Sequence, residues 1–420
     1  MDPAIVTLAI IGAAIVLFIW EIIPLALTAM LAVVAFTLTG VLSSSEAFAS
    51  FSSSTVVLVV ALFVLGGALF ETGMAARAGN VITRFADGQH QLIAAIMLVA
   101  GITSGFLSNT GTAAVLIPVV IGIAIRTGLN HRNLLMPLAF ASSMGGNLSL
   151  IGSTSNLLGD TILRRTFEGT GFSFFSFAMV GLPILLLGMC YMIFFGHRFK
   201  EDRDDTTSEV TRNPEPKSLY RQYGSLIVLA LTVLGMLLSD TIGLPIHLIA
   251  VIGALFVILI RVIDEKEVYR NIDLRTIFIL AGLLPMSAAL QKSGAGEMIA
   301  NHVVGWLGGD PSPFILLNVL FLLTAFLSQF MSNTAAVGLM APIGGTIAVS
   351  IGADPMAVIM AVVIGGSCAF LTPLATSANT MILGVGNYRF SDFAKAGWPL
   401  MIIAYLVSIA LLPLFFPFYP

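Results

Sequence analysis

Charged residues are scarce in this sequence: of 420 residues, 10% are Asp, Glu, Lys or Arg, whereas 57% are hydrophobic. In a soluble domain about a quarter of the residues usually carry a charge. Too few polar side chains are therefore available to cover a water-facing surface. The apolar residues fall in blocks of roughly 20 residues, the length that a helix needs to cross a bilayer. The sequence therefore predicts an all-α polytopic membrane protein.

Other features that the sequence lacks exclude further classes of protein. The net charge of −3 provides no basic surface for nucleic acid. The two cysteines, Cys190 and Cys368, each lie in an apolar run and indicate no disulfide framework. The five histidines show no metal-ligand spacing, and neither a GxxxxGK[ST] phosphate loop nor a GxSxG motif occurs. An enzyme is therefore not expected.

The apolar blocks predict ten membrane crossings and two re-entrant hairpins. The hairpins cover residues 91–127 and 313–350, each too long for one crossing and each interrupted near its middle by Ser-Asn-Thr. Such polar, non-helical backbone is tolerated at membrane depth only where protein or a cavity surrounds it. The ten crossings are expected near residues 4–20, 22–41, 54–71, 133–163, 174–196, 222–239, 244–262, 273–290, 355–387 and 393–417.

The distribution of Lys and Arg predicts the orientation of these crossings. If the hydrophilic segment 197–221 is a cytoplasmic linker, all but three of the 19 Lys and Arg residues lie inside. The three on the outside are Arg164, Arg165 and Lys292. This bias follows the positive-inside rule for short loops. Both termini are then extracytoplasmic, and the expected location is the plasma membrane, which in a bacterium is the inner membrane.

The two halves of the sequence match each other. Ser108-Asn-Thr110 pairs with Ser332-Asn-Thr334 at an offset of 224 residues, and Ser153-Thr-Ser-Asn156 pairs with Thr376-Ser-Ala-Asn379 at 223. Each half holds five crossings, and an odd number places the second copy upside down in the membrane. Inverted repeats of this kind are typical of transporters, whose binding sites lie near the midplane at interrupted helices.

The repeat predicts the domain organisation. We expect two inverted-topology repeats of five transmembrane helices, each with a re-entrant hairpin and an interrupted helix. The first repeat covers 1–196, with its hairpin at 91–127 and its interrupted helix at 133–163. The second covers 222–420, with its hairpin at 313–350 and its interrupted helix at 355–387.

The predicted crossings contain almost no ionisable groups at their centres, so a binding site must use hydroxyls, amides and backbone. These polar groups gather at residues 104–112, 147–156, 328–334 and 371–380. Where a helix is interrupted, the free N–H groups at the new N-terminus favour an anion. Exposed carbonyls, together with Ser, Thr and Asn oxygens, suit a hard cation. Such a site can bind Na⁺ and an anion together, each lowering the electrostatic cost of the other.

The motifs at these four places resemble those of the divalent anion/sodium symporter family, the dicarboxylate and sulfate transporters of the wider ion-transporter superfamily. The resemblance covers nearly the whole chain, and its most specific parts are Ser108–Pro118, Gly146–Asn156, Ser332–Pro342 and Leu374–Asn379. It implies a homodimer in which a scaffold holds a moving transport domain, with an elevator-type mechanism.

The resemblance also implies roles for individual residues. One sodium site would use Ser104, Ser108, Asn109 and the backbone near Gly152, and the other would use Ser328, Ser332, Asn333 and the backbone near Ala375. The residues expected to bind the substrate anion are Asn109, Thr110, Thr154, Asn156, Asn333, Thr334, Thr376 and Asn379.

We therefore expect a secondary active transporter that couples inward flow of Na⁺ to uptake of a divalent anion, either a C4 dicarboxylate or sulfate. One alternative is an anion exchanger or a proton-coupled anion carrier on the same scaffold. Alternatives from other classes are a channel and a membrane enzyme, and the sequence offers no catalytic residues for the latter. Lipid, sodium ions and the anion are the expected partners.

Overall fold

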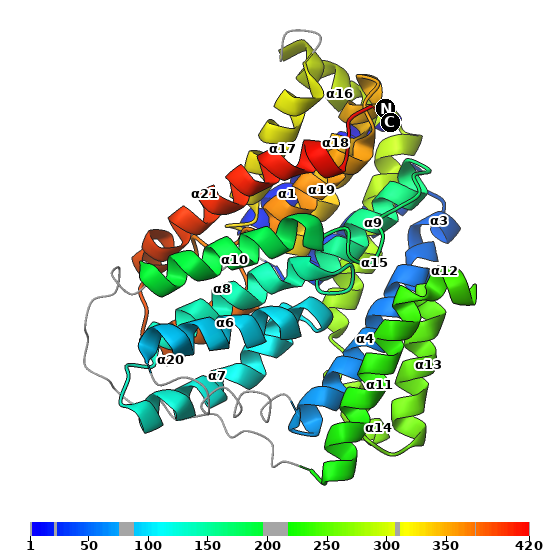
Figure 1. The fold of residues 1–420 in the computed structure, drawn as a ribbon. Helices are drawn as coiled ribbons and strands as arrows, with labels where there is room; N and C mark the ends of the chain where they lie inside the picture. The colour runs from blue at the N-terminus through cyan, green and yellow to red at the C-terminus, as the bar shows by residue number, and fades with distance from the viewer. Residues whose placement is uncertain are drawn as a thin grey trace.

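The computed structural model describes residues 2–20, 23–74, 88–195, 217–306, 311–373 and 375–419. Every regular element in these ranges is helical (Figure 1). The first part of the chain contains α1 (Pro3–Trp20), α2 (Leu25–Leu38), α3 (Ser44–Phe48), η1 (Ala49–Ser52), α4 (Ser54–Glu71), α6 (Gln89–Phe106), α7 (Asn109–Thr127), α8 (Arg132–Gly145), η2 (Gly146–Leu148), α9 (Thr154–Thr166) and α10 (Ala178–Phe194). The second part contains α11 (Leu219–Leu237), α12 (Ser239–Ile242), α13 (Ile246–Leu259), α14 (Glu265–Asn271), α15 (Leu274–Lys292), α16 (Ala295–Trp306), α17 (Pro313–Leu327), α18 (Asn333–Ser350), α19 (Pro355–Ser367), α20 (Ser377–Val385) and α21 (Phe390–Phe415).

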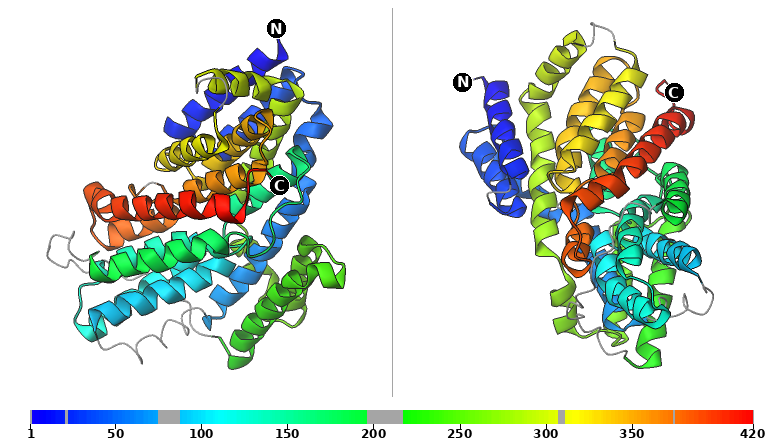
Figure 2. Two further views of the ribbon diagram at one scale, coloured as in Figure 1. Left: turned by 45° about the horizontal axis from the view of Figure 1, so that its top comes forward. Right: turned by 90° about the vertical axis from the view of Figure 1, so that its left-hand side faces the viewer.

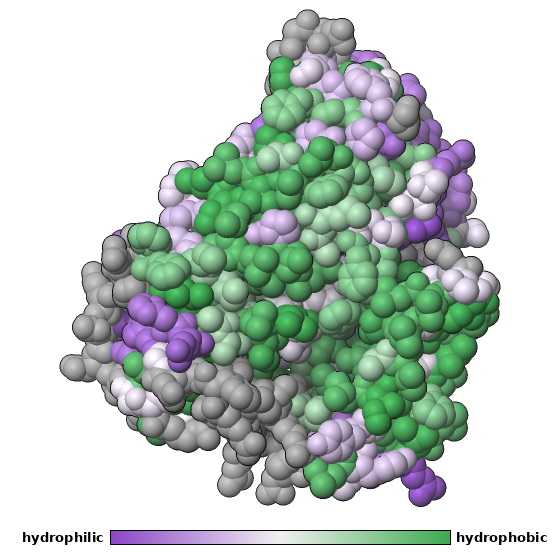
Figure 3. All heavy atoms as spheres, in the orientation of Figure 1, coloured by the Kyte–Doolittle hydropathy of each residue, from purple (hydrophilic) through white to green (hydrophobic). Residues whose placement is uncertain are grey.

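The helices have the length and composition of membrane spans. Within the described ranges, six helical stretches are long and apolar enough to cross a bilayer: Ser44–Glu71, Gln89–Phe106, Leu219–Leu237, Leu274–Lys292, Asn333–Ser350 and Phe390–Phe415. Shorter apolar helices accompany them. The surface agrees, because apolar side chains cover most of the face in Figure 3, and residues such as Leu259 and Leu414 are 77% and 72% exposed. The prediction of an all-α polytopic membrane protein is confirmed.

The helices pack in two groups, and each group draws on both halves of the chain (Figures 1 and 2). In the first, which we name the scaffold group, α2 and α16 pack against α15, and α11 and α13 pack against α4. In the second, the hairpin group, α6, α7 and α20 pack against α8, α17 and α18 pack against α19, α9 packs against α18, and α10 packs against α21. The two groups meet mainly where α15 and α16 contact α18 and where α4 and α15 contact α9. Each side of the interface between the two groups is therefore formed by helices that are distant in sequence.

Two helices of the hairpin group are interrupted. After α8, the η2 turn and an irregular segment lead to α9, and after α19 an irregular segment leads to α20. Small residues make room for these turns. A Cβ on Gly145 would lie 2.3 Å from the Gly101 carbonyl oxygen, and a Cβ on Gly152 would lie 2.6 Å from the Gly146 carbonyl oxygen. Only glycine permits this close approach of two backbones.

The longest of the helices that were not predicted from the sequence is α16, with 12 residues. The helix α16 (Ala295–Trp306) lies between α15 and the hairpin α17–α18, and it packs on α18. Its apolar residues are interrupted by Glu297, Asn301 and His302. That pattern is amphipathic and too short for a crossing, which is why a search for apolar blocks does not find it.

Candidate functional site

The two Ser-Asn-Thr turns meet at one cavity of about 430 Å³ between the two helix groups. Its hairpin-group wall is formed by the first residues of four helices, α7, α9, α18 and α20. The residues that contribute to this wall include Asn109, Thr110, Thr154, Asn333, Thr334, Thr376 and Ser377. Helix N-termini carry partial positive charge and free N–H groups, so this wall favours an anion without any cationic side chain.

Each Ser-Asn-Thr turn begins a helix in the same way. The hydroxyl of Ser108 accepts a hydrogen bond from the N–H of Gly111 (3.1 Å), and the hydroxyl of Ser332 accepts one from the N–H of Ala335 (3.2 Å). Both serines are N-caps with extended backbone, the position that serine favours before a helix. The asparagine and threonine that follow occupy the first helical turn, where their remaining N–H groups have no partner within the helix.

Behind the first turn, buried oxygen atoms converge. The hydroxyl oxygen of Ser104 lies 2.6 Å from the carbonyl oxygen of Ser142 and 2.8 Å from Oδ1 of Asn109. A hydroxyl carries one proton, so it can donate to only one of these acceptors at a time. Gly146 leaves the space for the asparagine, because a Cβ there would lie 2.5 Å from Asn109 Oδ1. These three oxygens therefore have more lone pairs than donors.

Behind the second turn the arrangement is similar but not identical. Oδ1 of Asn333 is buried and accepts no hydrogen bond from the described residues. The hydroxyl of Ser328 donates to the carbonyl of Ala325 (3.2 Å). An unpartnered buried carbonyl oxygen normally costs free energy, and a bound cation would remove that cost. The chemistry of both turns thus fits an oxygen-coordinated ion.

Asn156 and Asn379 were expected to bind the substrate, but in the structure they lie behind the lining of the cavity. Both are fully buried, and neither lines the cavity. Nδ2 of Asn156 donates to the carbonyls of Gly146 and Ser149 (2.8 Å each). Nδ2 of Asn379 donates to the carbonyls of Ala369 (2.9 Å) and Thr372 (3.0 Å). In both halves the acceptors lie ten and seven residues earlier, so each asparagine braces the turn before its own helix.

A second pair of bonds ties each interrupted helix to its hairpin. The hydroxyl of Ser149 donates to the carbonyl of Gly105, and the hydroxyl of Thr372 donates to the carbonyl of Gln329 (2.7 Å). Gln329 makes further bonds to the same segment: its Oε1 accepts from the N–H of Leu371 (3.0 Å), and its Nε2 donates to the carbonyl of Cys368 (2.9 Å). Gly105, at the corresponding place in the first half, has no side chain to do so.

The opposite wall of the cavity comes from the scaffold group. It consists of one face of α4 from Val59 to Phe70, together with Asn271, Asp273 and Thr276 beside the start of α15. Asp273 is the one ionisable residue among the described residues that line the cavity. Its carboxylate accepts from the N–H (3.3 Å) and hydroxyl (2.5 Å) of Thr276. The acid is exposed, so it lies at the mouth of the cavity.

The predicted site residues divide into two sets in the structure. Those that line the cavity are Ser108, Asn109, Thr110, Gly152, Thr154, Ser332, Asn333, Thr334, Ala375 and Thr376. Those that lie behind its lining are Ser104, Asn156, Ser328 and Asn379. Sequence reasoning missed Gln329 and Asp273. The one available indication for Gln329 was its position next to Ser328, and for Asp273 there was none.

A model of the citrate transporter family matches residues 15–365, and the chain belongs to that family. The resemblance that the motifs indicated is confirmed by curated relatives. The sodium-dependent dicarboxylate transporter SdcS of Staphylococcus saprophyticus is 23% identical, with 93% of this chain and 82% of the relative covered. The uncharacterized transporter YfbS of Escherichia coli is 25% identical, with 98% of this chain and 99% of the relative covered.

Two solved structures share the fold. The YdaH transporter of Alcanivorax borkumensis has a TM-score of 0.67 and 16% identity, with 90% of this chain and 89% of that chain covered. MtrF of Neisseria gonorrhoeae, described as one of a class of antimetabolite efflux pumps, has a TM-score of 0.61 and 16% identity, with 91% and 83% covered. The protein is therefore a multi-pass membrane transporter and not an enzyme.

Proposed function

We propose that this protein is a secondary active transporter that couples Na⁺ flow to the uptake of a divalent anion, either a C4 dicarboxylate or sulfate. One observation carries the proposal: four helix N-termini and two groups of electron-rich oxygens surround one cavity whose described lining residues include no cationic side chain. The family supports the anionic substrate, and a relative named as a sodium-dependent dicarboxylate transporter supports the ion.

The anion would lie between the two Ser-Asn-Thr turns. Asn109, Thr110, Asn333 and Thr334 project from the starts of α7 and α18 into the cavity. The hydroxyls of Thr154 and Thr334 lie 3.0 Å apart, so the two halves already meet at this point. The volume lies in the range of pockets for small ligands, about 300–1,000 Å³. N–H groups and hydroxyls are donors that serve a carboxylate or a sulfate alike.

A sodium ion would lie behind each turn. In the first half the available ligands are Ser104, Ser108 and Asn109 with backbone near Gly152, and in the second half they are Ser328, Ser332 and Asn333 with backbone near Ala375. All are oxygen donors, as a hard cation requires. Asn109 and Asn333 belong to both the ion sites and the anion site. That shared use supplies coupling, because an ion that fixes the asparagine also arranges the donors for the anion.

The moving part would be the hairpin group, carried past the scaffold group in an elevator-type motion within a homodimer. The equal spacing of the bonds from Asn156 and Asn379 supports an internal repeat, on which this motion depends. In the orientation favoured by the positive-inside rule, both termini would be extracytoplasmic, and the mouth of the cavity beside Asn271 and Asp273 would lie on the cytoplasmic side. The structure would then be an inward-facing state.

Uptake into proteoliposomes tests the proposal. Labelled succinate and labelled sulfate are offered with external Na⁺, and then with Na⁺ replaced by K⁺ or choline at constant ionic strength. We expect saturable uptake of at least one anion that depends on an inward Na⁺ gradient. Flux that is unchanged after replacement of Na⁺ would contradict sodium coupling and favour the exchanger, and flux driven by an imposed pH gradient would favour proton coupling.

A further inference from the structure

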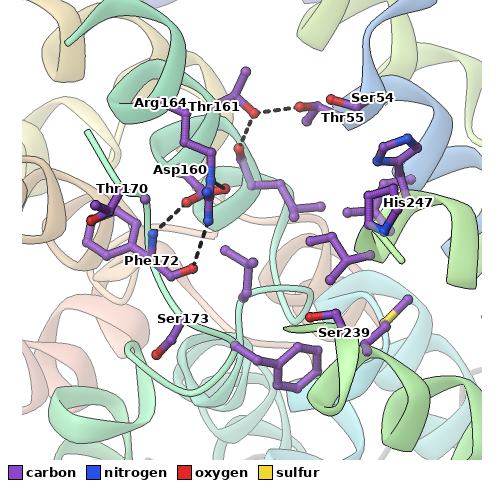
Figure 4. Close-up of a pocket in the computed structure, with 18 of the residues that line it drawn as sticks. Ser54, Thr55, Asp160, Thr161, Arg164, Thr170, Phe172, Ser173, Ser239 and His247 are labelled. Carbon is purple, nitrogen blue, oxygen red and sulfur yellow. Dashed lines mark hydrogen bonds and ion pairs between the residues drawn. The ribbon is translucent and has the colours of Figure 1, made fainter. Parts of the chain in front are cut away.

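A second and larger cavity, of about 1,000 Å³, is drawn in Figure 4. It adjoins the cavity of the two Ser-Asn-Thr turns, which we name the transport cavity, because Leu157 lines both. One side is formed by α9 and the segment that follows it, residues 170–175. The other sides are formed by the start of α4 and by the connection from α11 through α12 to α13. Segments from three separate regions of the chain thus enclose it, and the proposal above assigns it no role.

This cavity is cationic, whereas the transport cavity is acidic. Two arginines, Arg164 and Arg165, line it, and Asp160 is the one carboxylate among its described lining residues. Asp160 is already engaged, because its carboxylate accepts from Arg164 Nε (2.9 Å) and from the N–H of Phe172 (2.7 Å). Figure 4 shows this ion pair on one side of the cavity and His247 on the opposite side.

Arg165 carries the charge that remains uncompensated. It is exposed to the cavity and makes no hydrogen bond or ion pair with any residue in the part of the chain that the structure describes. By contrast, Arg164 is held by Asp160 and by the carbonyl of Phe172 (3.3 Å). Removing Arg165 would therefore change the potential of the cavity without removing a contact that supports the fold.

Arg164 and Arg165 lie on the side of the membrane where Lys and Arg are rare. In the orientation predicted above, Lys and Arg are rare on the outside, where the positive-inside rule disfavours them. The third outside cation, Lys292, is compensated by Glu46 at 2.8 Å. Because Arg164 is paired with Asp160, Arg165 is the one outside cation that no described residue compensates, and a function in attracting anions accounts for it.

The two cavities are separated by a thin wall. Leu157 of α9 lines both of them. Beside it, the hydroxyls of Thr55 on α4 and Thr161 on α9 are 2.5 Å apart in a buried hydrogen bond that joins the two helix groups. A shift of α9 relative to α4 would part this contact and open the transport cavity toward the cationic one.

We propose that the cavity around Arg165 is an extracytoplasmic recruitment site, where the divalent anion gathers before the transport cavity opens to that side. The inference rests on the proposed function, since it assumes that an anion is the substrate. Arg165 raises the local concentration of the anion, and Asp273 at the opposite mouth disfavours its return from the cytoplasm. Attraction of this kind acts on the rate of encounter and weakens with ionic strength.

The test is anion uptake by Arg165→Gln in proteoliposomes with the extracytoplasmic face outward, at low and at physiological ionic strength. We expect the KM for external anion to rise about threefold at low ionic strength, with less change at high salt, because salt screens an exposed charge. Arg165→Lys keeps the charge and restores the wild-type KM. Lys292→Gln, an outside cation remote from the cavity lining, serves as the matched control.

The inference is overturned if the KM of Arg165→Gln equals that of the wild type at low ionic strength, or if Lys292→Gln shifts it equally. A rise in KM that persists at high salt also overturns it, because that result indicates an altered binding site and not the loss of a long-range electrostatic attraction. The wild type distinguishes the two proposals. If it takes up no divalent anion under any ion gradient, the proposed function fails; if it does so and Arg165→Gln behaves like it, only the recruitment site fails.

Discussion

In both interrupted helices an asparagine side chain stabilises the irregular segment that precedes it. The two halves differ in the other bonds that hold this segment. In each half an asparagine, Asn156 or Asn379, donates to carbonyls ten and seven residues earlier. In the second half the amide of Gln329 adds bonds to Leu371 and Cys368, whereas the first half has Gly105 at that place. The segment before α20 is therefore held in shape by a side chain, and the segment before α9 lacks this support.

The difference indicates which ion site depends more on its ion. In the segment before α9, Oδ1 of Asn147 is buried and accepts no hydrogen bond from the described residues, and the described part of the segment before α20 has no such side chain. Oδ1 of Asn156 and Oδ1 of Asn379 are unpartnered alike among the described residues. Such oxygens make the empty turn less favourable, so occupancy by a cation should order it. We expect the first turn to change more between the sodium-bound and sodium-free protein than the second.

The largest effect is expected from the asparagines shared by the ion sites and the anion site. Asn109→Ala and Asn333→Ala should each reduce sodium-dependent uptake at least about tenfold, since loss of a group that fixes a metal site typically has this effect. The protein should still be produced and remain monodisperse in detergent, because each side chain lies at a turn and is only half-buried. Uptake near the wild-type rate in either variant would contradict the site.

A second pair of variants compares the braces. Asn156→Ala and Asn379→Ala each leave two buried carbonyls without a donor, at a cost of about 1–3 kcal/mol for each unsatisfied group. Both should lower the thermal unfolding midpoint of the purified protein. Asn156→Ala should lower it more, because Gln329 still holds the second turn in the other variant. An equal or larger loss in Asn379→Ala would show that Gln329 does not hold the turn.

Gln329→Ala removes the difference between the turns. The second turn then has to be ordered by the cation, so the Na⁺ concentration for half-maximal uptake should rise about threefold, which corresponds to roughly 0.6 kcal/mol. Gln291→Ala is the matched control, since Gln291 is exposed at the end of α15 and bonds to Thr166 (2.6 Å) outside the cavity. A sodium dependence identical to that of the wild type would indicate that the amide bonds are dispensable.

The smallest effect is expected at the contact between the halves. Thr154→Val keeps the shape of the side chain and removes the hydroxyl that lies 3.0 Å from that of Thr334. We expect the KM for the anion to rise about threefold, the consequence of losing one neutral hydrogen bond, with sodium dependence unchanged. Thr241→Val, at an exposed position in α12, is the control. A loss of sodium dependence instead would place Thr154 in an ion site.

Much of the fold could be predicted because a bilayer imposes length and composition on each helix. The sequence therefore indicated the helical class, and polar tripeptides in long apolar stretches marked where helices begin within them. The amphipathic α16 was missed because its Glu297 and His302 break the apolar block. Contacts between distant segments, such as His247 across a cavity from Arg164, depend on packing that no local pattern encodes.

The candidate site was predicted in its outline and not in its details. Asn109 and Asn333 line the cavity as expected, whereas Asn156 and Asn379 turn away from it. Each of the latter follows a capping residue by three positions, Ser153 or Thr376, where a side chain can reach back to the preceding turn. An amide there is as polar as one in the cavity, so residue type alone could not separate bracing from binding.

Anion-dependent sodium flux tests the central claim, that one cavity without a cationic side chain among its described lining residues holds the cation beside the anion. Proteoliposomes are given radioactive sodium outside, with and without a gradient of the anion that the wild type transports, and sodium accumulation is measured. The account predicts that the anion stimulates sodium entry in wild-type vesicles and that Asn109→Ala abolishes this stimulation. Transport of the anion with no accompanying sodium flux would contradict it.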